Sequence, residues 1–406
     1  MRAAHILLIA TFACMILAPM TAQLIGFDPG QPLEENRTLA KLIAFPSSLN
    51  QAVSLPAEAD DYLRDHFGLR RLALRIHDKL VWYILRESPS VQVTRGRDGT
   101  LFFNSHTAKY PYSLIATSCG IGLSAADVTA AADQVRTFLR QAHGINPAST
   151  LVIIPTKAPI YPELLPTWLD ERCRTATPPA ILIERQLLGE PELATMLDYP
   201  LEEMLALKTS VPVYPSQSFH WAGEMPRILS EQISEKTFGL TKILNFRTHT
   251  VVAQSDLQRF IPGIPLWVEV PEPDYAAAGV RPCFGPACFP EIGKLAEQLA
   301  DVSRFRSNNG AGKKLLMVTD SFGAAIAVWF SQYFSEVWHL NVNSLINVSG
   351  DPINQANLSK AIFSDFRPDR VIYLFHDGAA LYAPAKLSKI LSVNSIVTTP
   401  NDVGRH

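Results

Sequence analysis

The chain has 406 residues, of which 47% are hydrophobic and 18% are charged, and its formal net charge is -2. This composition is typical of a globular protein and excludes a wholly disordered chain. Lysine and arginine are spread along the sequence without a basic run, which argues against a nucleic-acid-binding protein.

The first 27 residues predict a membrane anchor. Arg2 is the only charged residue before Asp28, and the uncharged stretch between them is long enough to span a bilayer. Met20-Thr21-Ala22 fits the cleavage site of a signal peptide poorly, so we expect the segment to be retained. A cleaved signal is the alternative, and in both cases the rest of the chain would lie outside the cytoplasm.

Several elements are expected in the N-terminal half. Apolar residues at helical spacing predict an amphipathic helix over 60–85. An Asp-Gly turn within residues 95–103 leads into a short strand. Ser124 is a typical N-cap, so a long helix is expected from there to Gly144, followed by a buried strand over 150–154.

Buried strands and helices also alternate in the C-terminal half. Strands are expected over 313–319, 336–342 and 370–375, with a helix near 354–363. This alternation is typical of a parallel α/β sheet. Residues from about 240 to 310 are less regular and predict an insertion.

Five cysteines constrain the fold further. Cys14 belongs to the anchor, and the other four form an even set in an exported chain, so disulfides are expected. Four cysteines allow three pairings. Proximity in sequence alone favours Cys283 with Cys288, which leaves Cys119 with Cys173. No histidine or cysteine pair flanks them at zinc spacing, so no metal site is expected.

The strand over 313–319 stops at the polar tripeptide Asp320-Ser321-Phe322, and a helix is expected after it. A serine in such a strand-to-helix turn lies at the carboxyl edge of the sheet, beside backbone N–H groups. This geometry suits a nucleophile, because those donors can stabilise an oxyanion. His220 is a candidate base far upstream. The alternative is that Ser321 only caps the helix.

Six short motifs resemble, in the same order, the AlgJ/AlgX-like proteins of alginate O-acetylation, a branch of the SGNH hydrolase superfamily. The resemblance extends from about residue 34 to 375, and its specificity comes from the shared order of the motifs. The motifs are Glu35-Asn36-Arg37, Asp65-His66-Phe67-Gly68-Leu69-Arg70, Gly96-Arg97-Asp98-Gly99-Thr100-Leu101-Phe102, Pro155-Thr156-Lys157 with Ile160-Tyr161-Pro162-Glu163, Ser218-Phe219-His220-Trp221, and Asp320-Ser321-Phe322.

The resemblance implies a flavodoxin-like α/β/α sandwich of the SGNH hydrolase type. The expected organisation is an anchor over 1–27, a linker and N-terminal extension over 28–115, the SGNH-like domain over 116–395, and a tail over 396–406. The irregular insertion over about 240–310 would fall inside the domain.

The activity implied is O-acetylation of an alginate-like extracellular polysaccharide through an acetyl-serine, without a cofactor. The acceptor would be the exopolysaccharide, and a multi-pass membrane acyltransferase would supply the acetyl group. The protein would be anchored in the bacterial inner membrane with a periplasmic body, or be periplasmic if the signal is cleaved.

By this resemblance Ser321 is the nucleophile and His220 the general base. The family has an aspartate where this chain has Ser218, and in a serine protease loss of that acid costs on the order of 10⁴ in rate. Asp377 is a possible substitute acid and His376 an alternative base, because both follow the strand over 370–375. The alternative is that His376-Asp377-Gly378 is only a turn.

Four further residues are expected to bind substrate: Lys157, Tyr161, Glu163 and Trp221. The first three belong to a loop that ends a neighbouring strand, so they would line the cleft, and Trp221 would be an exposed aromatic that stacks on sugars. The alternative for Lys157, Tyr161 and Glu163 is a structural role. The missing acid leaves two other functions open. One is a catalytically impaired protein that binds polysaccharide or serves as a scaffold in an acetylation complex, and the other is an acetyl esterase.

Overall fold

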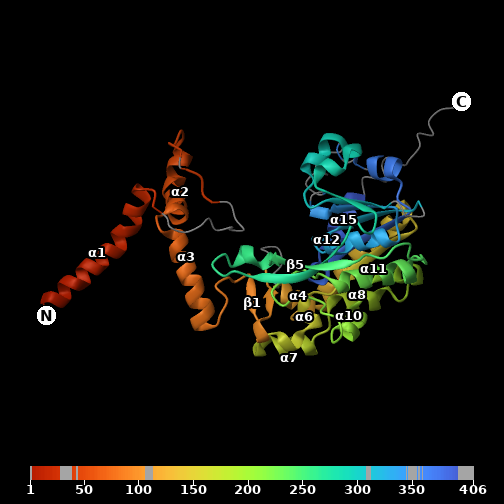
Figure 1. The fold of residues 1–406 in the computed structure, drawn as a ribbon, viewed down its shortest axis with the longest axis horizontal. Coiled ribbons are helices and arrows are strands. Elements are labelled where there is room, and N and C mark those ends of the chain that lie inside the picture. The colour runs from red at the N-terminus through yellow and green to blue at the C-terminus, as the bar shows by residue number, and fades with distance from the viewer. Residues whose placement is uncertain are drawn as a thin grey trace. The chain divides into compact units, whose positions relative to one another are not determined.

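The computed structural model is shown in Figure 1. It divides into two compact units, Met1–Thr94 with Gln254–Leu266, and Arg95–Ala253 with Trp267–His406. Each unit is described by itself. The residues described are 2–27, 39–42, 44–105, 113–307, 312–343, 345, 354, 357–358 and 360–391.

The first unit is helical. Its helices are α1 (Arg2–Leu24), α2 (Leu49–His66) and α3 (Arg70–Lys79), and a π-helical turn over Leu80–Leu85 follows α3. Within α1, the part Ala4–Leu24 is long and apolar enough to cross a membrane, a property that signal sequences share.

The single helix expected over 60–85 is interrupted between α2 and α3. Leu69 adopts a left-handed conformation with φ of 65°. Gly68 packs closely against α1, because a Cβ there would lie 2.1 Å from the carbonyl oxygen of Pro19. The amphipathic pattern predicted one helix, whereas the structure has two, the first of which begins already at Leu49. The break depends on a contact with a segment far away in sequence.

The second unit is built on a seven-stranded sheet. Five neighbouring strands are parallel, and two antiparallel strands extend one edge. In spatial order the strands are β4 (Leu197–Asp198), β3 (Ser149–Ile154), β11 (Arg370–His376), β9 (Lys314–Thr319), β10 (Glu336–Asn341), β8 (Ser303–Ser307) and β7 (Val280–Phe284). Strands β7 and β8 come from the segment expected to be irregular.

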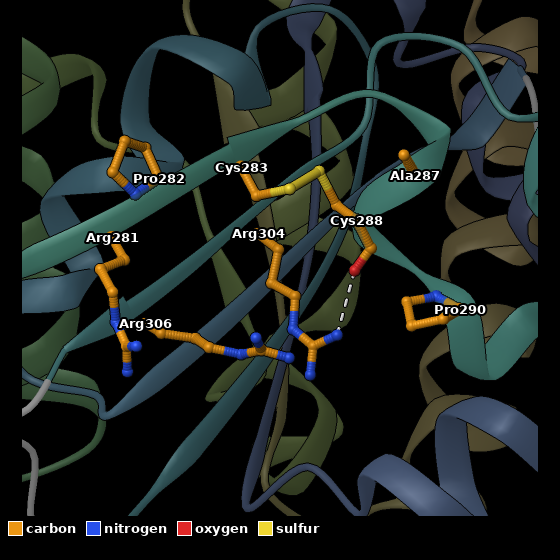
Figure 2. Close-up of a pocket in the computed structure, with 8 residues that line it drawn as sticks. All are labelled: Arg281, Pro282, Cys283, Ala287, Cys288, Pro290, Arg304 and Arg306. Atoms are coloured by element: carbon orange, nitrogen blue, oxygen red, sulfur yellow. Dashed lines mark hydrogen bonds between the residues drawn. A yellow bond between two sulfur atoms is a disulfide. The ribbon is translucent and has the colours of Figure 1, made fainter.

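Two disulfides are formed in this unit, as expected from the sequence. Cys119 pairs with Cys173 across a Cα–Cα distance of 5.1 Å, and Cys283 pairs with Cys288 across 5.7 Å. The second disulfide closes a short loop next to β7 and is drawn in Figure 2.

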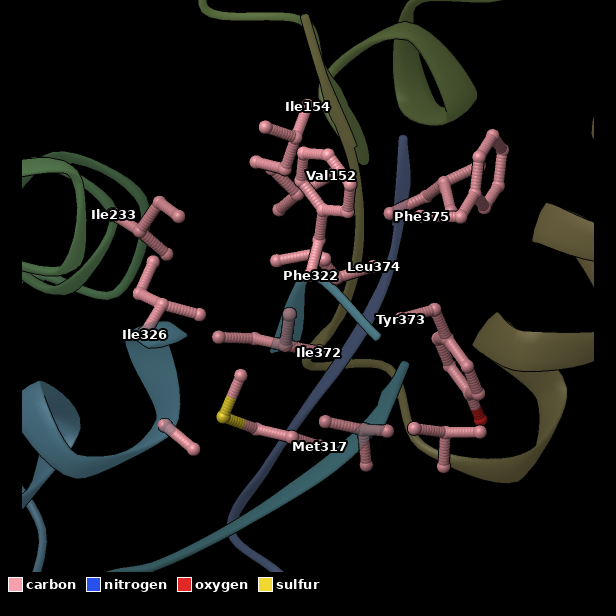
Figure 3. Packing of buried hydrophobic residues seen from close by; sticks show 14 of the residues in the cluster. Val152, Ile154, Ile233, Met317, Phe322, Ile326, Ile372, Tyr373, Leu374 and Phe375 are labelled. Atoms are coloured by element: carbon pink, nitrogen blue, oxygen red, sulfur yellow. The ribbon is translucent and has the colours of Figure 1, made fainter. Parts of the chain in front are cut away.

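Helices cover both faces of the sheet, which gives the predicted α/β/α sandwich. On one face lies α5 (Ala125–Ile145), and its Phe138 meets the ring of Tyr373 edge-on at 4.9 Å. Ser124 caps α5 in a capping box with Asp127. Figure 3 shows Ile326 on the opposite side of β11 from Tyr373.

The remaining helices pack around this core. Helices α8 (Pro179–Leu187) and α15 (Ala383–Leu391) contact α5, whereas α11 (Glu224–Gln232) contacts α12 (Gly323–Ala327). Shorter elements of the chain are α4 (Leu114–Cys119), α6 (Lys157–Ile160), α7 (Thr167–Thr175), α9 (Pro191–Ala194), α10 (Leu201–Leu207), β1 (Val93–Arg95), β2 (Leu101–Phe103), β5 (Thr248–Gln254) and β6 (Trp267–Pro273).

Some sequence expectations lie outside the described residues. They are the motif Glu35-Asn36-Arg37, the tail over 396–406, and residues 355, 356 and 359 of the helix expected near 354–363.

Candidate active site

Ser321 lies in the turn that follows β9, at the carboxyl edge of the parallel strands, and it is exposed. Asp320 organises this turn. Its carboxylate accepts hydrogen bonds from the N–H groups of Phe322 and His376, both at 2.9 Å. Its carbonyl oxygen accepts one from Gly323 N–H at 3.1 Å. The turn is therefore tied to the neighbouring strand β11.

His220 supplies the partner of the serine. Its Nε2 lies 2.8 Å from Ser321 Oγ. The histidine belongs to residues 215–221, here called the histidine loop, which precedes α11. Trp221 fixes the end of this loop, because its Nε1–H donates to the carbonyl oxygen of Phe322 at 2.9 Å. The structure thus joins the two residues that sequence analysis assigned as nucleophile and base.

Trp221 itself is 1% exposed. The expectation that it stacks on a sugar is therefore wrong, because its ring packs in the core. Its indole connects the histidine loop to the turn that carries Ser321.

Lys157 also has a different place from the one expected. It is 3% exposed, and its ammonium donates to the carbonyl oxygens of Pro215, Ser216 and Leu101 at 2.8, 3.1 and 3.0 Å. A further bond goes to the carbonyl oxygen of Ser218. The buried charge is satisfied by peptide oxygens, so Lys157 supports the histidine loop instead of binding substrate.

Tyr161 and Glu163 brace the same region. The hydroxyl of Tyr161 accepts a hydrogen bond from Val213 N–H at 3.1 Å. Glu163 forms an ion pair with Lys208 at 2.9 Å, and that ammonium lies 5.4 Å from the centre of the Tyr161 ring. Both residues thus have structural partners, and their binding of substrate stays a prediction.

Ser218 stands where the AlgJ/AlgX-like motif that this segment resembles has an aspartate, and it is buried. Its N–H donates to the carbonyl oxygen of Pro215 at 3.3 Å, and its own carbonyl accepts from Lys157. A serine hydroxyl can accept a hydrogen bond, but it cannot balance the positive charge of an imidazolium.

Asp377 does not replace that acid. Its side chain is fully buried, and its two carboxylate oxygens accept hydrogen bonds from Thr156 N–H at 3.1 Å and Tyr199 O–H at 3.0 Å. Burial raises the pKa of Asp377 from 3.8 to about 7. This carboxyl group joins the end of β11 to the segment after β3, and the expected role beside His220 is corrected.

His376 is close to the pair but is not bonded to the serine. Its Nε2 lies 3.8 Å from the Asp320 carboxylate, and its ring contacts Phe219 and Phe322. Among the described residues its buried Nδ1 has no hydrogen-bond partner. Burial lowers the pKa of His376 against the opposing effect of the Asp320 carboxylate, and His220 lowers it further. The alternative assignment of His376 as the base is therefore corrected in favour of His220.

A buried polar chain beneath the turn was missed by the sequence analysis. His339 of β10 joins Thr319 Oγ1 through Nε2 at 2.7 Å and Ser303 Oγ through Nδ1 at 3.2 Å. The Thr319 hydroxyl donates to the carbonyl oxygen of Asp320 at 2.7 Å. Burial lowers the pKa of His339 to about 4, so the ring is neutral at pH 7.

The direction of proton donation along these hydrogen bonds can be assigned. Because the Thr319 hydroxyl donates its proton to Asp320, His339 Nε2 must carry the ring proton, and Nδ1 accepts from Ser303. These hydrogen bonds hold the carbonyl group of Asp320 in place. That carbonyl belongs to the same peptide group as the N–H of Ser321, so the N–H is held as well. A histidine inside an apolar strand was the only sequence signal for these hydrogen bonds.

Glycine is required where α12 begins. A Cβ at Gly323 would lie 1.9 Å from Thr319 Oγ1, closer than any non-bonded contact permits. The absence of a side chain lets α12 start directly above the strand end, which keeps the serine at the edge of the sheet.

The arrangement contains a serine hydroxyl, an imidazole that can take its proton, and a backbone held rigidly around both. Such a pair is suited to acyl transfer. Within the described ranges, no group of three or more histidine, cysteine or acidic side chains could hold a metal ion.

Among known proteins, this chain is similar to several solved structures. No protein-family model matches the chain, and no curated protein matches significantly. The solved structures include a DHHW family protein from Eubacterium siraeum, with 13% identity, a TM-score of 0.45, and coverage of 64% of this chain and 88% of that one.

Two other neighbours come from Pseudomonas. The O-acetyltransferase domain of Pseudomonas putida AlgJ is 16% identical, with a TM-score of 0.39 and coverage of 74% of this chain and 98% of that one. Pseudomonas aeruginosa AlgX is 12% identical, with a TM-score of 0.41 and coverage of 75% and 67%.

Proposed function

We propose that this chain is an SGNH-type O-acetyltransferase that acetylates an extracellular, alginate-like polysaccharide through an acetyl-serine intermediate. The observation that carries the proposal is the 2.8 Å hydrogen bond between His220 Nε2 and Ser321 Oγ. The choice of acetyl group and polysaccharide comes from the six motifs that resemble the alginate O-acetylation proteins.

In the first half-reaction, His220 Nε2 takes the hydroxyl proton of Ser321 while Oγ attacks the acetyl carbonyl carbon of the donor. The tetrahedral intermediate collapses, and the departing group receives the proton from the imidazolium. Ser321 then carries the acetyl ester.

In the second half-reaction, a sugar hydroxyl gives its proton to His220 and attacks the acetyl carbonyl. Collapse of this intermediate forms the sugar ester and returns the proton to Ser321 Oγ. An acetyl esterase would differ only in using water as the acceptor.

The backbone around the serine restricts which groups can stabilise the oxyanion. Asp320 already engages the N–H groups of Phe322 and Gly323. We therefore assign Ser321 N–H as the donor to the oxyanion. Its peptide group is held in place by the hydrogen bonds that link His339, Thr319 and the Asp320 carbonyl.

Ser218 favours a second candidate, a binding or scaffold protein with little catalysis. Without a carboxylate at this position the imidazolium formed in the transition state is less stabilised, and the family's rate would fall. The bonded serine and histidine favour the enzyme.

The test is hydrolysis of a chromogenic acetyl ester by the full-length protein and by Ser321→Ala. We expect kcat/KM to fall by about 10³-fold or more in the variant, because the nucleophile is lost. Ser210→Ala is the matched control, since Ser210 is exposed and its hydroxyl bonds only its own turn at Leu207. Equal rates of hydrolysis for wild type and Ser321→Ala would contradict the proposed enzymatic function and favour a binding or scaffold function.

A further inference from the structure

Lys157 is a buried charge that takes no part in the proposed acyl transfer. It is the first residue of α6 and is 3% exposed. Transfer of an ammonium group from water to a protein interior is unfavourable unless hydrogen bonds replace those made with water. An apolar side chain of similar volume would avoid this penalty, so the ammonium provides something that such a side chain lacks.

The ammonium provides hydrogen-bond donors to two separate segments. In the histidine loop it donates to the carbonyl oxygens of Pro215 and Ser216 at 2.8 and 3.1 Å, and also to that of Ser218. On β2 it donates to the carbonyl oxygen of Leu101 at 3.0 Å. An ammonium group carries three donors on one atom and no acceptor, so it can bind several peptide oxygens at one point.

Further contacts close this arrangement around the ammonium. The carbonyl oxygen of Ser216 also accepts a hydrogen bond from Leu101 N–H at 2.8 Å. The rings of Phe102 and Tyr214 lie with their centres 5.9 Å from Lys157 Nζ, within the range of a cation–π interaction. The first half of the histidine loop is thus fixed against β2 and α6.

The backbone beside Lys157 is fixed to the sheet. Thr156 N–H donates to the Asp377 carboxylate at 3.1 Å, and the carbonyl oxygen of Pro155 accepts from the Tyr214 hydroxyl. These bonds hold the start of α6 at the carboxyl end of β3, the sheet edge that also carries the nucleophile. The loop with the base and the turn with the nucleophile therefore share one rigid support.

The second half of the histidine loop is fixed to the turn itself. Trp221 Nε1–H donates to the carbonyl oxygen of Phe322 at 2.9 Å. The centre of the Phe219 ring lies 4.8 Å from that of Phe103 on β2 and 5.1 Å from that of Phe322. His220 is therefore placed between a segment held by the ammonium and a residue held by the turn.

Three of the six sequence motifs meet at this ammonium. The motif over 96–102 supplies the carbonyl oxygen on β2, and the motif that begins at Pro155 supplies the lysine. The motif over 218–221 supplies a further carbonyl oxygen together with the base. The proposed reaction uses a side chain from only the last of these motifs. Support of the histidine loop gives the other two a role in the same site.

We propose that Lys157 is a positioning residue for acyl transfer. Its ammonium holds the histidine loop so that His220 Nε2 stays 2.8 Å from Ser321 Oγ. Misplacement of a reacting group by about 1 Å can cost on the order of 10² in rate. The effect of Lys157 on the reaction rests on the proposed function, whereas its effect on the place of His220 does not.

The first test is steady-state hydrolysis of a chromogenic acetyl ester by full-length Lys157→Met. We expect kcat to fall by about 10²-fold and KM to stay within about twofold, because Lys157 acts on the base and does not contact the ester. Lys314→Met is the matched control and should keep the wild-type kcat. Lys314 is half-buried and its ammonium also donates to a carbonyl oxygen, that of Phe366 at 3.1 Å, but it lies at the start of β9, at the far end from Ser321.

Two further variants separate positioning from a loss of stability. Ile183→Ala removes buried methyl groups from α8, outside the site, and should lower the denaturant midpoint while keeping kcat. Lys157→Gln keeps two N–H donors without the charge, so its kcat should lie between those of the wild type and Lys157→Met. It also serves if Lys157→Met does not fold, which circular dichroism shows. Failure of both Lys157 variants to fold would overturn the proposal in favour of a role in folding alone.

The place of the base is measured without any reaction. In protein labelled with ¹³C at histidine Cε1, the NMR signal of His220 is identified by its absence in His220→Ala. We expect this signal to shift or broaden in Lys157→Met, because the ring samples several positions, and to stay unchanged in Lys314→Met. An unchanged His220 signal in a folded Lys157 variant would overturn the proposal, and so would a wild-type kcat in an active protein.

The two measurements separate this proposal from the proposed function. If the wild type hydrolyses no ester but the His220 signal changes in Lys157→Met, the positioning of His220 by Lys157 stands and the enzyme assignment fails. If the wild type is active and Lys157→Met has the same kcat, the enzyme assignment stands and the positioning role fails.

Discussion

The turns after β9 and β11 leave neighbouring parallel strands at the same edge of the sheet, and each contains an aspartate. After β9, Asp320 accepts hydrogen bonds from two backbone N–H groups and presents Ser321 to His220. After β11, Asp377 is buried beneath the surface and bonds Thr156 and Tyr199. One turn presents a reactive group, and the other joins strands.

The difference shows that a position at the carboxyl edge is insufficient to identify a catalytic residue. What separates the two turns is the chain that folds over each. The histidine loop reaches Ser321, whereas the segment after β3 and the hydroxyl of Tyr199 cover Asp377. Substitutions of residues in the two turns should therefore have unequal effects on activity.

The largest effect is expected for His220→Ala. Ester hydrolysis should fall by about 10³–10⁴-fold in kcat/KM, because the serine loses the group that takes its proton. His376→Gln is the matched control on the neighbouring strand and should cost less than about tenfold, as its ring is not bonded to Ser321. Steady-state kinetics of both variants decide the matter, and a greater loss in His376→Gln would reverse the assignment of the base.

An intermediate effect is expected for Thr319→Val, which removes the hydroxyl that connects His339 to the Asp320 carbonyl. We expect kcat to fall by about tenfold with little change in KM, since the peptide before Ser321 is less well fixed. Thr319→Ser keeps the hydroxyl and should retain kcat within about threefold. If both variants lose activity equally, the methyl group and not the hydrogen bond is what matters.

The smallest effect on activity is expected for Asp377→Asn. An amide can accept from Thr156 N–H and donate to the Tyr199 oxygen, so kcat should stay within about threefold. A triad acid would instead lose on the order of 10⁴ on the same change. A loss of that size would show that Asp377 acts on His220.

The same variant tests the ionisation of the buried carboxyl group. Asp377 titrates near pH 7 when folded and at its ordinary 3.8 when unfolded, so the folded state holds the proton between these values. Its contribution to stability is complete below about pH 4 and decreases as pH rises to about 7. Denaturant unfolding should therefore show a stability difference between wild type and Asp377→Asn that changes over this interval and levels off above it.

The sequence predicted those features that depend on local pattern. The turn at Ser321 follows from an apolar strand interrupted by polar residues, and the capping of α5 follows from Ser124 with Asp127. The association of Ser321 with His220 was inferred from motif order, and the two are hydrogen bonded in the structure.

The features that sequence analysis missed depend on burial set by distant segments. Lys157 was expected in a cleft, but the histidine loop folds over its ammonium and supplies carbonyl oxygens. Trp221 was expected to be exposed, but its indole bonds to the backbone of Phe322. Nothing in the local sequence of either residue indicates which segment will cover it.

The most direct test of the account is to locate the acetyl group on the protein. The full-length chain is mixed briefly with an activated acetyl ester, quenched in acid, digested and analysed by mass spectrometry. We predict one added acetyl group on the peptide that contains Ser321, and none there in Ser321→Ala or His220→Ala. Consumption of the ester with an acetyl group on another residue, or with no acetyl-enzyme in a chain that still transfers acetyl groups, would contradict the acetyl-Ser321 mechanism.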